Sequence, residues 1–254
     1  MENKENHRGT CRVLDILEFI SKSENGYTMT EICKAIQAPK SSIFPILHTL
    51  VNRGFLSLNL ADSKYYIDQM AFEVGSAYLE RFHILDEVEK EMRNMVNVCT
   101  ETCHLGKLDH GDVLYLKKID SPEAIRMIST VGHRLPAYGT GLGKALLADY
   151  EIAELKKLYP AGLQPLTPHT IVDFEELAAQ LKKVQREGFS YECEESNQYI
   201  RCIGTPIRQE GKIVAALSIA VPVFRYSEEK ADLIRHLLAN ARKKIESMMV
   251  RTGC

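Results

Sequence analysis

No run of apolar residues in this sequence approaches the ~18 that a membrane-spanning helix needs. Residues 1–5 also lack the apolar segment of a secretory signal. We therefore expect a cytoplasmic protein with no membrane partner. The length of 254 residues, of which 45% are hydrophobic, suffices for two medium domains with ordinary cores.

The seven cysteines include no CxxC pair and follow no regular framework, which predicts reduced thiols rather than structural disulfides. Cys99 and Cys103 have the spacing to share one helix face. Two thiolates without a neighbouring cysteine or histidine pair nevertheless make a poor zinc site, and the histidines are scattered without ligand spacing. We expect no metal and no other cofactor.

A basic excess is also missing. The formal net charge is -2, and residues 1–82 contain nine Lys or Arg against ten Asp or Glu, which argues against a protein that coats nucleic acid through charge alone. Any DNA contact must come from single basic groups placed against phosphates. The groups available for this are Arg8, Arg12, Lys40, Arg53 and Lys64.

Two short helices joined by a tight turn are predicted over residues 28–53. The first would start at an N-cap Thr30 and end before Pro39, because a proline cannot continue a preceding helix. The second would bury one apolar face at helical spacing. That face consists of Ile43, Ile46, Leu47, Leu50 and Val51.

Pro45 conflicts with a long second helix, since a proline in a helix interior costs ~3 kcal/mol. We therefore expect the regular helix to start near Ser41 or Ser42, which places Pro45 in or beside its first turn. The other face of this helix is small and polar, as a base-reading helix needs. Its members are Ser41, Ser42, Pro45, His48 and Asn52.

A hairpin is predicted after these helices. Gly54 stands where a left-handed helix cap is expected, and residues 55–59 and 64–68 alternate like two strands. Helix, helix and hairpin make a winged helix-turn-helix, which predicts binding to double-stranded operator DNA; a plain helical bundle and a protein-binding head remain the alternatives. The residues expected to contact DNA are Arg8, Lys40, Ser41, Ser42, His48 and Lys64.

The rest of the chain predicts a linker helix over residues 70–82 and then an α+β domain. Strands before and after helices, with hairpin-length connections, point to an antiparallel sheet with helices packed on it. The expected strands are 101–108, 113–119, 125–130, 189–193, 200–208 and 212–221, and the expected helices are 84–98, 144–148, 151–159, 174–187 and 227–249.

An enzyme is the main functional alternative. Residues 139–144 read GTGLGK, but they lack the GxxxxGK[ST] spacing of a phosphate-binding loop, and Ala145 stands where the metal-binding hydroxyl belongs. Cys202 has no histidine or aspartate assignable to it as a partner in thiol catalysis. The sequence therefore favours a binding protein, with a GAF-like thiol enzyme as the weaker hypothesis.

Several motifs in a fixed order resemble the IclR family of bacterial transcriptional regulators. They are RVLDIL at 12–17, PKSS at 39–42, ETCHLG at 101–106, GLGKALLA at 141–148 and IRCI at 200–203. The resemblance implies a winged helix-turn-helix DNA-binding domain over 1–69, a linker helix over 70–83, and a GAF-like effector-binding and oligomerisation domain over 84–254. It also implies a homodimer or a dimer of dimers.

Within the family, the chain looks closest to repressors of sugar-acid breakdown of the 2-keto-3-deoxygluconate type, through KIDS at 118–121 and RYSEE at 225–229. The implied function is a ligand-responsive repressor of a catabolic operon, with control of aromatic or glyoxylate-type acid catabolism as the alternative. Two residues depart from the family pattern: Pro45 stands where an arginine is usual, and Ala220 where some members have a second pocket serine. The implied effector pocket consists of Gly141, Leu142, Glu192, Ile200, Cys202 and Ser218.

A small carboxylate is the expected effector. The N–H groups at a helix N-terminus bind carboxylates, so the charge would dock on the amides of residues 141–143 while Ser218 adds a hydroxyl donor. Glu192 would repel an anion unless it accepts hydrogen bonds from ligand hydroxyls. That condition favours a polyhydroxy acid such as a sugar acid.

Overall fold

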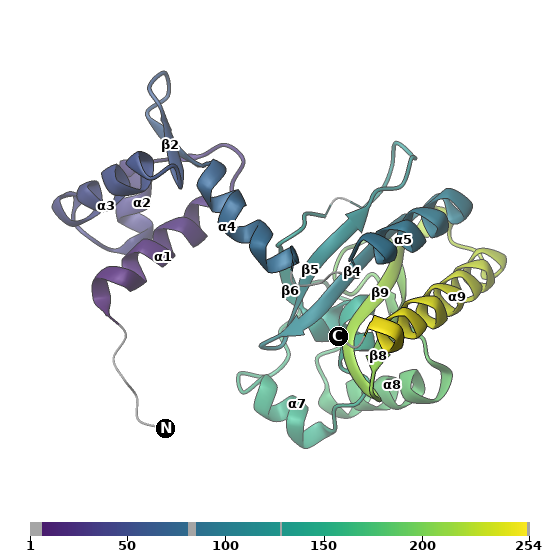
Figure 1. The fold of residues 1–254 in the computed structure, drawn as a ribbon. Helices are drawn as coiled ribbons and strands as arrows, with labels where there is room; N and C mark the ends of the chain where they lie inside the picture. Colours follow the sequence, from purple (N-terminus) through teal and green to yellow (C-terminus); the bar gives the residue numbers. More distant parts are fainter. Residues whose placement is uncertain (1–6, 81–84, 128, 253–254) are drawn as a thin grey trace. The chain divides into compact units, whose positions relative to one another are not determined.

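The computed structural model of the protein describes residues 7–80, 85–127 and 129–252. The chain divides into two compact units, 1–82 and 83–254 (Figure 1). The three-part division with a separate linker stays a prediction. No helix in the described ranges is both long enough and apolar enough to cross a membrane.

The first unit is a small helical core with a three-stranded sheet in the order β1-β3-β2. Its core is formed by side chains such as Ile16, Ile32, Ile43 and Leu47, which are fully buried. The two-residue strand β1 was not predicted, because it pairs with a strand almost 40 residues further along the chain. The elements are α1 (Arg8–Ile20), β1 (Tyr27–Thr28), α2 (Met29–Ile36), α3 (Lys40–Asn52), β2 (Leu56–Asn59), β3 (Lys64–Ile67) and α4 (Gln69–Glu80).

The N-cap of helix α2 lies two residues before the predicted cap at Thr30, so that prediction is wrong. Thr28 caps the helix instead, because its Oγ1 accepts a hydrogen bond from the Glu31 N–H (3.4 Å) while the Glu31 carboxylate accepts one from the Thr28 N–H (2.8 Å). This reciprocal capping box satisfies two amide donors that would otherwise be unpaired. It is available only when a glutamate or glutamine stands three residues after the cap.

Helix α3 also differs from its prediction. It begins at Lys40, and Pro45 is its sixth residue, well inside the helix. Helical bonding is established before the proline, since the N–H groups of Ser42 and Ile43 both donate to the carbonyl of Pro39 (2.9 and 3.2 Å). The hydrogen bond that Pro45 cannot make lies on the solvent-exposed face, where water can replace it.

The end of α3 agrees with the sequence. Gly54 has φ = 71°, and the N–H groups of Gly54 and Phe55 donate to the carbonyls of Val51 (3.0 Å) and Leu50 (2.9 Å). This is a Schellman motif, which requires the left-handed conformation that glycine adopts without steric cost. The predicted cap at Gly54 is confirmed.

The second unit contains a six-stranded antiparallel sheet in the order β6-β5-β4-β9-β8-β7, so that its edges are the two shortest strands. The strands are β4 (Thr102–Asp109), β5 (Asp112–Ile119), β6 (Arg134–Pro136), β7 (Ser190–Cys193), β8 (Ile200–Gln209) and β9 (Lys212–Pro222). Apart from β6, each lies within one or two residues of its predicted position.

The strand predicted over residues 125–130 is wrong, because none of the described residues in that range is in a strand. This segment is held instead by side chains of β4 and β5. The Ser129 hydroxyl lies 2.7 Å from Nε2 of His104, and the Ser129 carbonyl accepts a hydrogen bond from Lys118 (2.6 Å). The edge strand β6 follows it in the chain and pairs with β5.

Helices cover both faces of the sheet (Figure 1). The helices α5 and α9 pack against each other on one face, and the helices α6, α7 and α8 gather on the other. The bounds are α5 (Leu85–Cys99), α6 (Gly141–Leu146), α7 (Ile152–Leu158), α8 (Phe174–Glu187) and α9 (Glu228–Thr252), with 3₁₀ turns η1 (Ala137–Gly139) and η2 (Val223–Arg225).

Candidate functional site

The solvent-exposed face of α3 is the first candidate site. Ser41 and His48 are exposed on it and Ser42 is half-buried, while Ile43 and Leu47 on the opposite face are fully buried. Nδ1 of the His48 ring lies 3.2 Å from the side-chain nitrogen of Asn52. A helix of this kind, with one apolar and one small polar face, is the element that a helix-turn-helix presents to a DNA groove.

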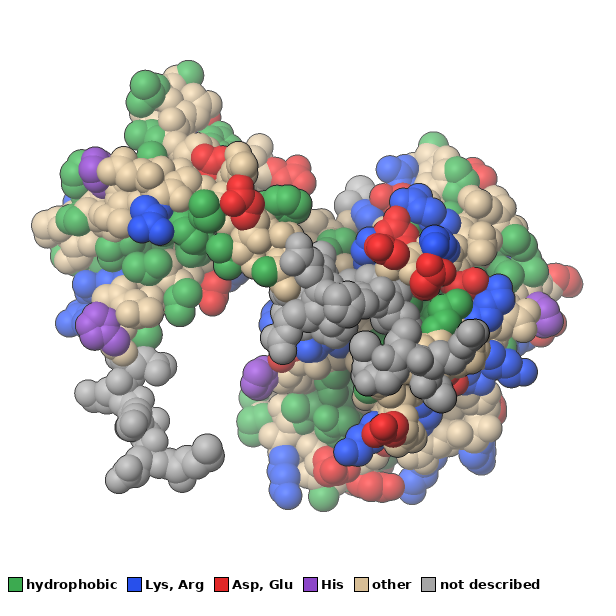
Figure 2. All heavy atoms as spheres, viewed as in Figure 1, with side chains coloured by type: hydrophobic (Ala, Val, Ile, Leu, Met, Phe, Trp, Pro, Cys, Tyr) green, Lys and Arg blue, Asp and Glu red, His purple; other side chains and the backbone are tan. Residues whose placement is uncertain are grey.

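The remaining predicted DNA contacts lie on other elements. Arg8 is exposed in the first turn of α1, and Lys64 in β3 donates a hydrogen bond to the carbonyl of Asn25 (3.1 Å). The visible face of this unit carries isolated basic side chains rather than one continuous patch (Figure 2). This distribution agrees with the lack of a basic excess in the sequence.

The effector-pocket residues on strands share one face of the second sheet. Cys202 of β8 pairs in register with Glu192 of β7 and with Ala220 of β9, and Ser218 pairs with His104 of β4. Because side chains alternate along a strand, residues two apart, such as Ser218 and Ala220, point to the same side. Ile200 lies in the same buried cluster as Cys202 and Ala220.

The start of α6 sits directly on this face. A Cβ added to Gly141 would lie 2.8 Å from the Cβ of Cys202, and one added to Gly204 would lie 2.7 Å from the Gly141 carbonyl oxygen. The Ser190 hydroxyl donates a hydrogen bond to the same carbonyl (2.6 Å). Glycine is needed at both positions because no side chain fits between helix and strand.

The structure changes two of the ligand contacts that were predicted for α6. The Leu142 side chain is 1% exposed and packs into the apolar core, so only its backbone is left for the predicted ligand contact. The Gly143 N–H already donates to the hydroxyl of the N-cap Thr140 (2.8 Å). The expectation that this amide holds the effector is therefore wrong, since the N-cap residue uses it.

Glu192 is the charged member of this face. Its Oε1 accepts hydrogen bonds from the N–H groups of Glu195 (2.6 Å) and Ser196 (3.0 Å). Its Oε2 is buried and has no hydrogen-bond partner among the described residues. Burial raises the pKa of this carboxyl above its ordinary value. An unpaired, buried carboxyl oxygen is costly and is suited to a polar ligand group.

The thiol of Cys202 is unsuited to catalysis. Burial raises the pKa of Cys202 well above its ordinary value, and Glu192 raises it further. The thiolate is the nucleophilic form of cysteine, so a thiol held in its protonated form does not serve as a nucleophile.

His104 is a polar residue of this face that the sequence did not single out as a site. Its side chain is 2% exposed and its ring meets that of Tyr115 edge to face, with centroids 5.3 Å apart. Burial, with a smaller effect from Lys118, lowers the pKa of His104 to about 4. It is therefore neutral at pH 7. The only signal for this residue in the sequence was a histidine within a predicted strand.

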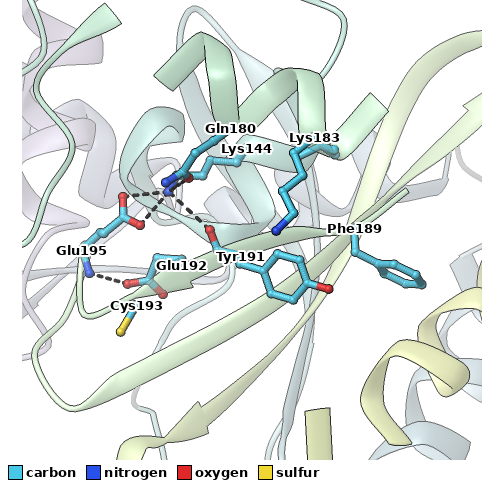
Figure 3. A pocket seen from close by; sticks show the side chains of 9 residues that line it. Lys144, Gln180, Lys183, Phe189, Tyr191, Glu192, Cys193 and Glu195 are labelled. Carbon is cyan, nitrogen blue, oxygen red and sulfur yellow. Dashed lines mark hydrogen bonds and ion pairs between the residues drawn. The ribbon is translucent and has the colours of Figure 1, made fainter. Parts of the chain in front are cut away.

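A cavity of about 280 Å³ lies beside β7 and α8. Of the predicted pocket residues it includes only Glu192. At its floor Lys144 is fully buried, and its Nζ donates to both carboxylate oxygens of Glu195 (2.6 and 2.8 Å), to Gln180 (2.7 Å) and to the Tyr191 carbonyl (3.3 Å) (Figure 3). Lys144 is thus committed to internal partners, which removes the phosphate-loop interpretation of residues 139–144.

The described residues contain no group of three or more His, Cys, Asp or Glu side chains that could hold a metal ion. The candidate sites are therefore a polar helix face in the first unit and a buried polar sheet face in the second. A helix-turn-helix binds DNA through its exposed helix, and a second domain with a buried polar face is what a ligand-responsive, DNA-binding transcriptional regulator needs.

Comparison with known proteins gives the family. Residues 11–59 match the IclR helix-turn-helix domain, and residues 76–247 match the bacterial transcriptional regulator IclR C-terminal domain. The chain belongs to the IclR family of bacterial transcriptional regulators. The predicted α+β fold class is confirmed, and since the relatives are transcriptional regulators, so is the expectation that this protein is not an enzyme.

Relatives match over almost the whole chain. The HTH-type transcriptional regulator KdgR of Escherichia coli K12 is 31% identical over 240 residues, covering 94% of this chain and 91% of that protein. KdgR of Dickeya chrysanthemi is 32% identical, covering 94% and 78%. The crystal structure of an IclR regulator from Alicyclobacillus acidocaldarius has the same fold, with a TM-score of 0.84 at 20% identity over 95% of this chain and 98% of that one.

Proposed function

We propose that this regulator represses a catabolic operon for a sugar acid, and that a small carboxylate effector releases it from operator DNA. We further propose that it acts in the cytoplasm as a homodimer or a dimer of dimers. The observation that carries the proposal is the buried polar face in the second unit, where Glu192, Ser218 and the start of α6 converge. The similarity to KdgR regulators over 94% of the chain supports the same branch of the family.

The proposed operator contact is the exposed face of α3, with Lys40, Ser41, Ser42 and His48 towards the DNA and with Arg8 and Lys64 on flanking phosphates. Phosphate contacts fix the position of such a head, and base-edge contacts give its specificity. With few basic groups available, the loss of even one good contact or the gain of one repulsive charge has a large effect on affinity.

Ser41→Glu is therefore expected to weaken binding to the protein's own upstream DNA by about 100-fold, since like charges brought together at an interface cost several kcal/mol. The helix itself tolerates the change, because an acidic residue in the first turn is favourable. Fluorescence anisotropy at two salt concentrations is the measurement. Lys22→Gln, which changes the net charge by the same amount at an exposed position outside α3, is the control, and unchanged affinity in Ser41→Glu would refute the placement of α3.

The proposed effector contact places the carboxylate on the N–H groups of Gly141 and Leu142, and the ligand hydroxyls on Ser218 and Glu192. The unpaired Oε2 of Glu192 supports a ligand that brings a hydroxyl donor. Binding changes DNA affinity only if the effector prefers one arrangement of the protein over another, and a tenfold effect needs about 1.4 kcal/mol of coupling.

Ser218→Val is expected to weaken sugar-acid binding by about tenfold, because a hydrogen bond to a charged or strongly polar ligand contributes about 1.5 kcal/mol. Isothermal titration calorimetry with sugar acids, matched neutral sugars, glyoxylate and an aromatic acid is the measurement. Tighter binding of the neutral sugars would contradict a carboxylate site. Tighter binding of glyoxylate or the aromatic acid would contradict the sugar-acid branch alone.

A further inference from the structure

One large, exposed apolar side chain of α3 lies beside the small polar residues of its DNA-facing side. Phe44 is 54% exposed although it lies within a folded helix. Its neighbours Ile43 and Leu47 point into the core and are fully buried, whereas the Phe44 ring lies 6.2 Å from the His48 ring, centroid to centroid. Phe44 therefore lies next to the face proposed to meet the operator, one turn into the helix.

The chemistry of this face limits which bases it can recognise. Guanine is most often read by an arginine or lysine, and Lys40 at the first position is the only such residue in α3. Pro45, in the middle of the face, has no hydrogen-bonding side chain. An apolar ring matches a different feature of the major groove, the 5-methyl group of thymine, which is the one apolar group that a base presents there.

We propose that Phe44 is a specificity-determining residue that packs against a thymine 5-methyl group in the operator and so selects an A·T pair at that position. The inference rests on the proposed placement of α3 on DNA. Burial of one methyl-sized group contributes about 0.8 kcal/mol, which corresponds to about a fourfold change in affinity. The Phe44 ring makes no hydrogen bond to the base pair, so its contribution to base selection comes from contact with the methyl group.

The test replaces thymine by deoxyuridine, which pairs identically with adenine and lacks only the methyl group. Duplexes are first selected from a random pool with the full chain. Each thymine of the tightest duplex is then changed singly to deoxyuridine, and affinity is measured for the wild type and for Phe44→Ala at one salt concentration. We expect one position where deoxyuridine weakens wild-type binding by about fourfold and where Phe44→Ala does not distinguish the two bases.

Leu14→Ala is the matched control, since Leu14 is 52% exposed on α1, outside the reading helix; it should retain the thymine preference. A thymine preference that persists unchanged in Phe44→Ala, or a duplex in which no thymine methyl affects wild-type binding, would overturn the inference. Wild-type-like DNA binding by Ser41→Glu would instead overturn the placement of α3, and the role of Phe44 with it, so the two failures are distinguishable. Circular dichroism establishes that each variant is folded.

Discussion

Replacing Glu195 with alanine is expected to lower the free energy of unfolding by about 3–5 kcal/mol, because removal of one partner leaves the other charge buried and uncompensated. Lys144 is 0% exposed and Glu195 is 5% exposed. Without the carboxylate, the lysine would keep only the uncharged acceptors Gln180 and the Tyr191 carbonyl. The measurement is urea unfolding of the full chain at pH 7, followed by circular dichroism.

The double variant Lys144→Met with Glu195→Leu is the control for the loss of Glu195. Apolar replacement of both partners of a buried ion pair is often neutral or stabilising, so this variant should recover most of the stability that Glu195→Ala loses. If the double variant is as unstable as the single one, the loss reflects packing of the loop that carries Glu195 and not an uncompensated charge.

The wild-type protein is expected to lose about 3 kcal/mol of stability through His104 between about pH 6.5 and pH 4. This magnitude follows from the fall of the His104 pKa from its ordinary 6.5 to about 4. Within this window the unfolded chain binds a proton at His104 and the folded protein does not, so the stability decreases as the pH decreases. Below both pKa values the folded and unfolded states bind the proton equally, and this loss of stability is complete.

The contribution of His104 is isolated with His104→Gln, which keeps a hydrogen-bonding group near Ser129 but does not titrate. Its urea-unfolding stability should fall less steeply than that of the wild type, and the difference should grow as the pH is lowered from 6.5 to 4. His133→Gln, at an exposed position before β6, is the control. Parallel pH profiles for the wild type and His104→Gln would show that His104 is not held neutral by burial.

Local sequence signals predicted most of the elements, because periodicity and helix caps act over a few residues. The cap at Gly54 and the helix over 174–187 are found where expected. The errors have a common cause in distant contacts. Residues 125–130 alternate well enough to suggest a strand, but Ser129 is held by His104, 25 residues away, and Pro45 is accepted inside α3 because its lost hydrogen bond faces solvent.

The candidate pocket was predicted from family motifs rather than from spacing, since its members come from α6, β7, β8 and β9. The structure brings the strand residues to one face, which no local pattern indicates. The Lys144–Glu195 pair was not predicted because its members are 51 residues apart and a lysine in a short helix is normally solvated. All six residues of α6 are buried, so this helix has no exposed face on which Lys144 could be solvated.

The edges of the second sheet have a consequence for self-association. An open sheet edge is a template for strand pairing between molecules, and short edge strands limit aggregation by that route. Here the outer strands are β6, with three residues, and β7, with four. The Tyr191 carbonyl of β7 is also already a hydrogen-bond acceptor for Lys144 (3.3 Å). A second molecule therefore finds few backbone groups at either edge with which to extend this sheet, which limits strand pairing between molecules.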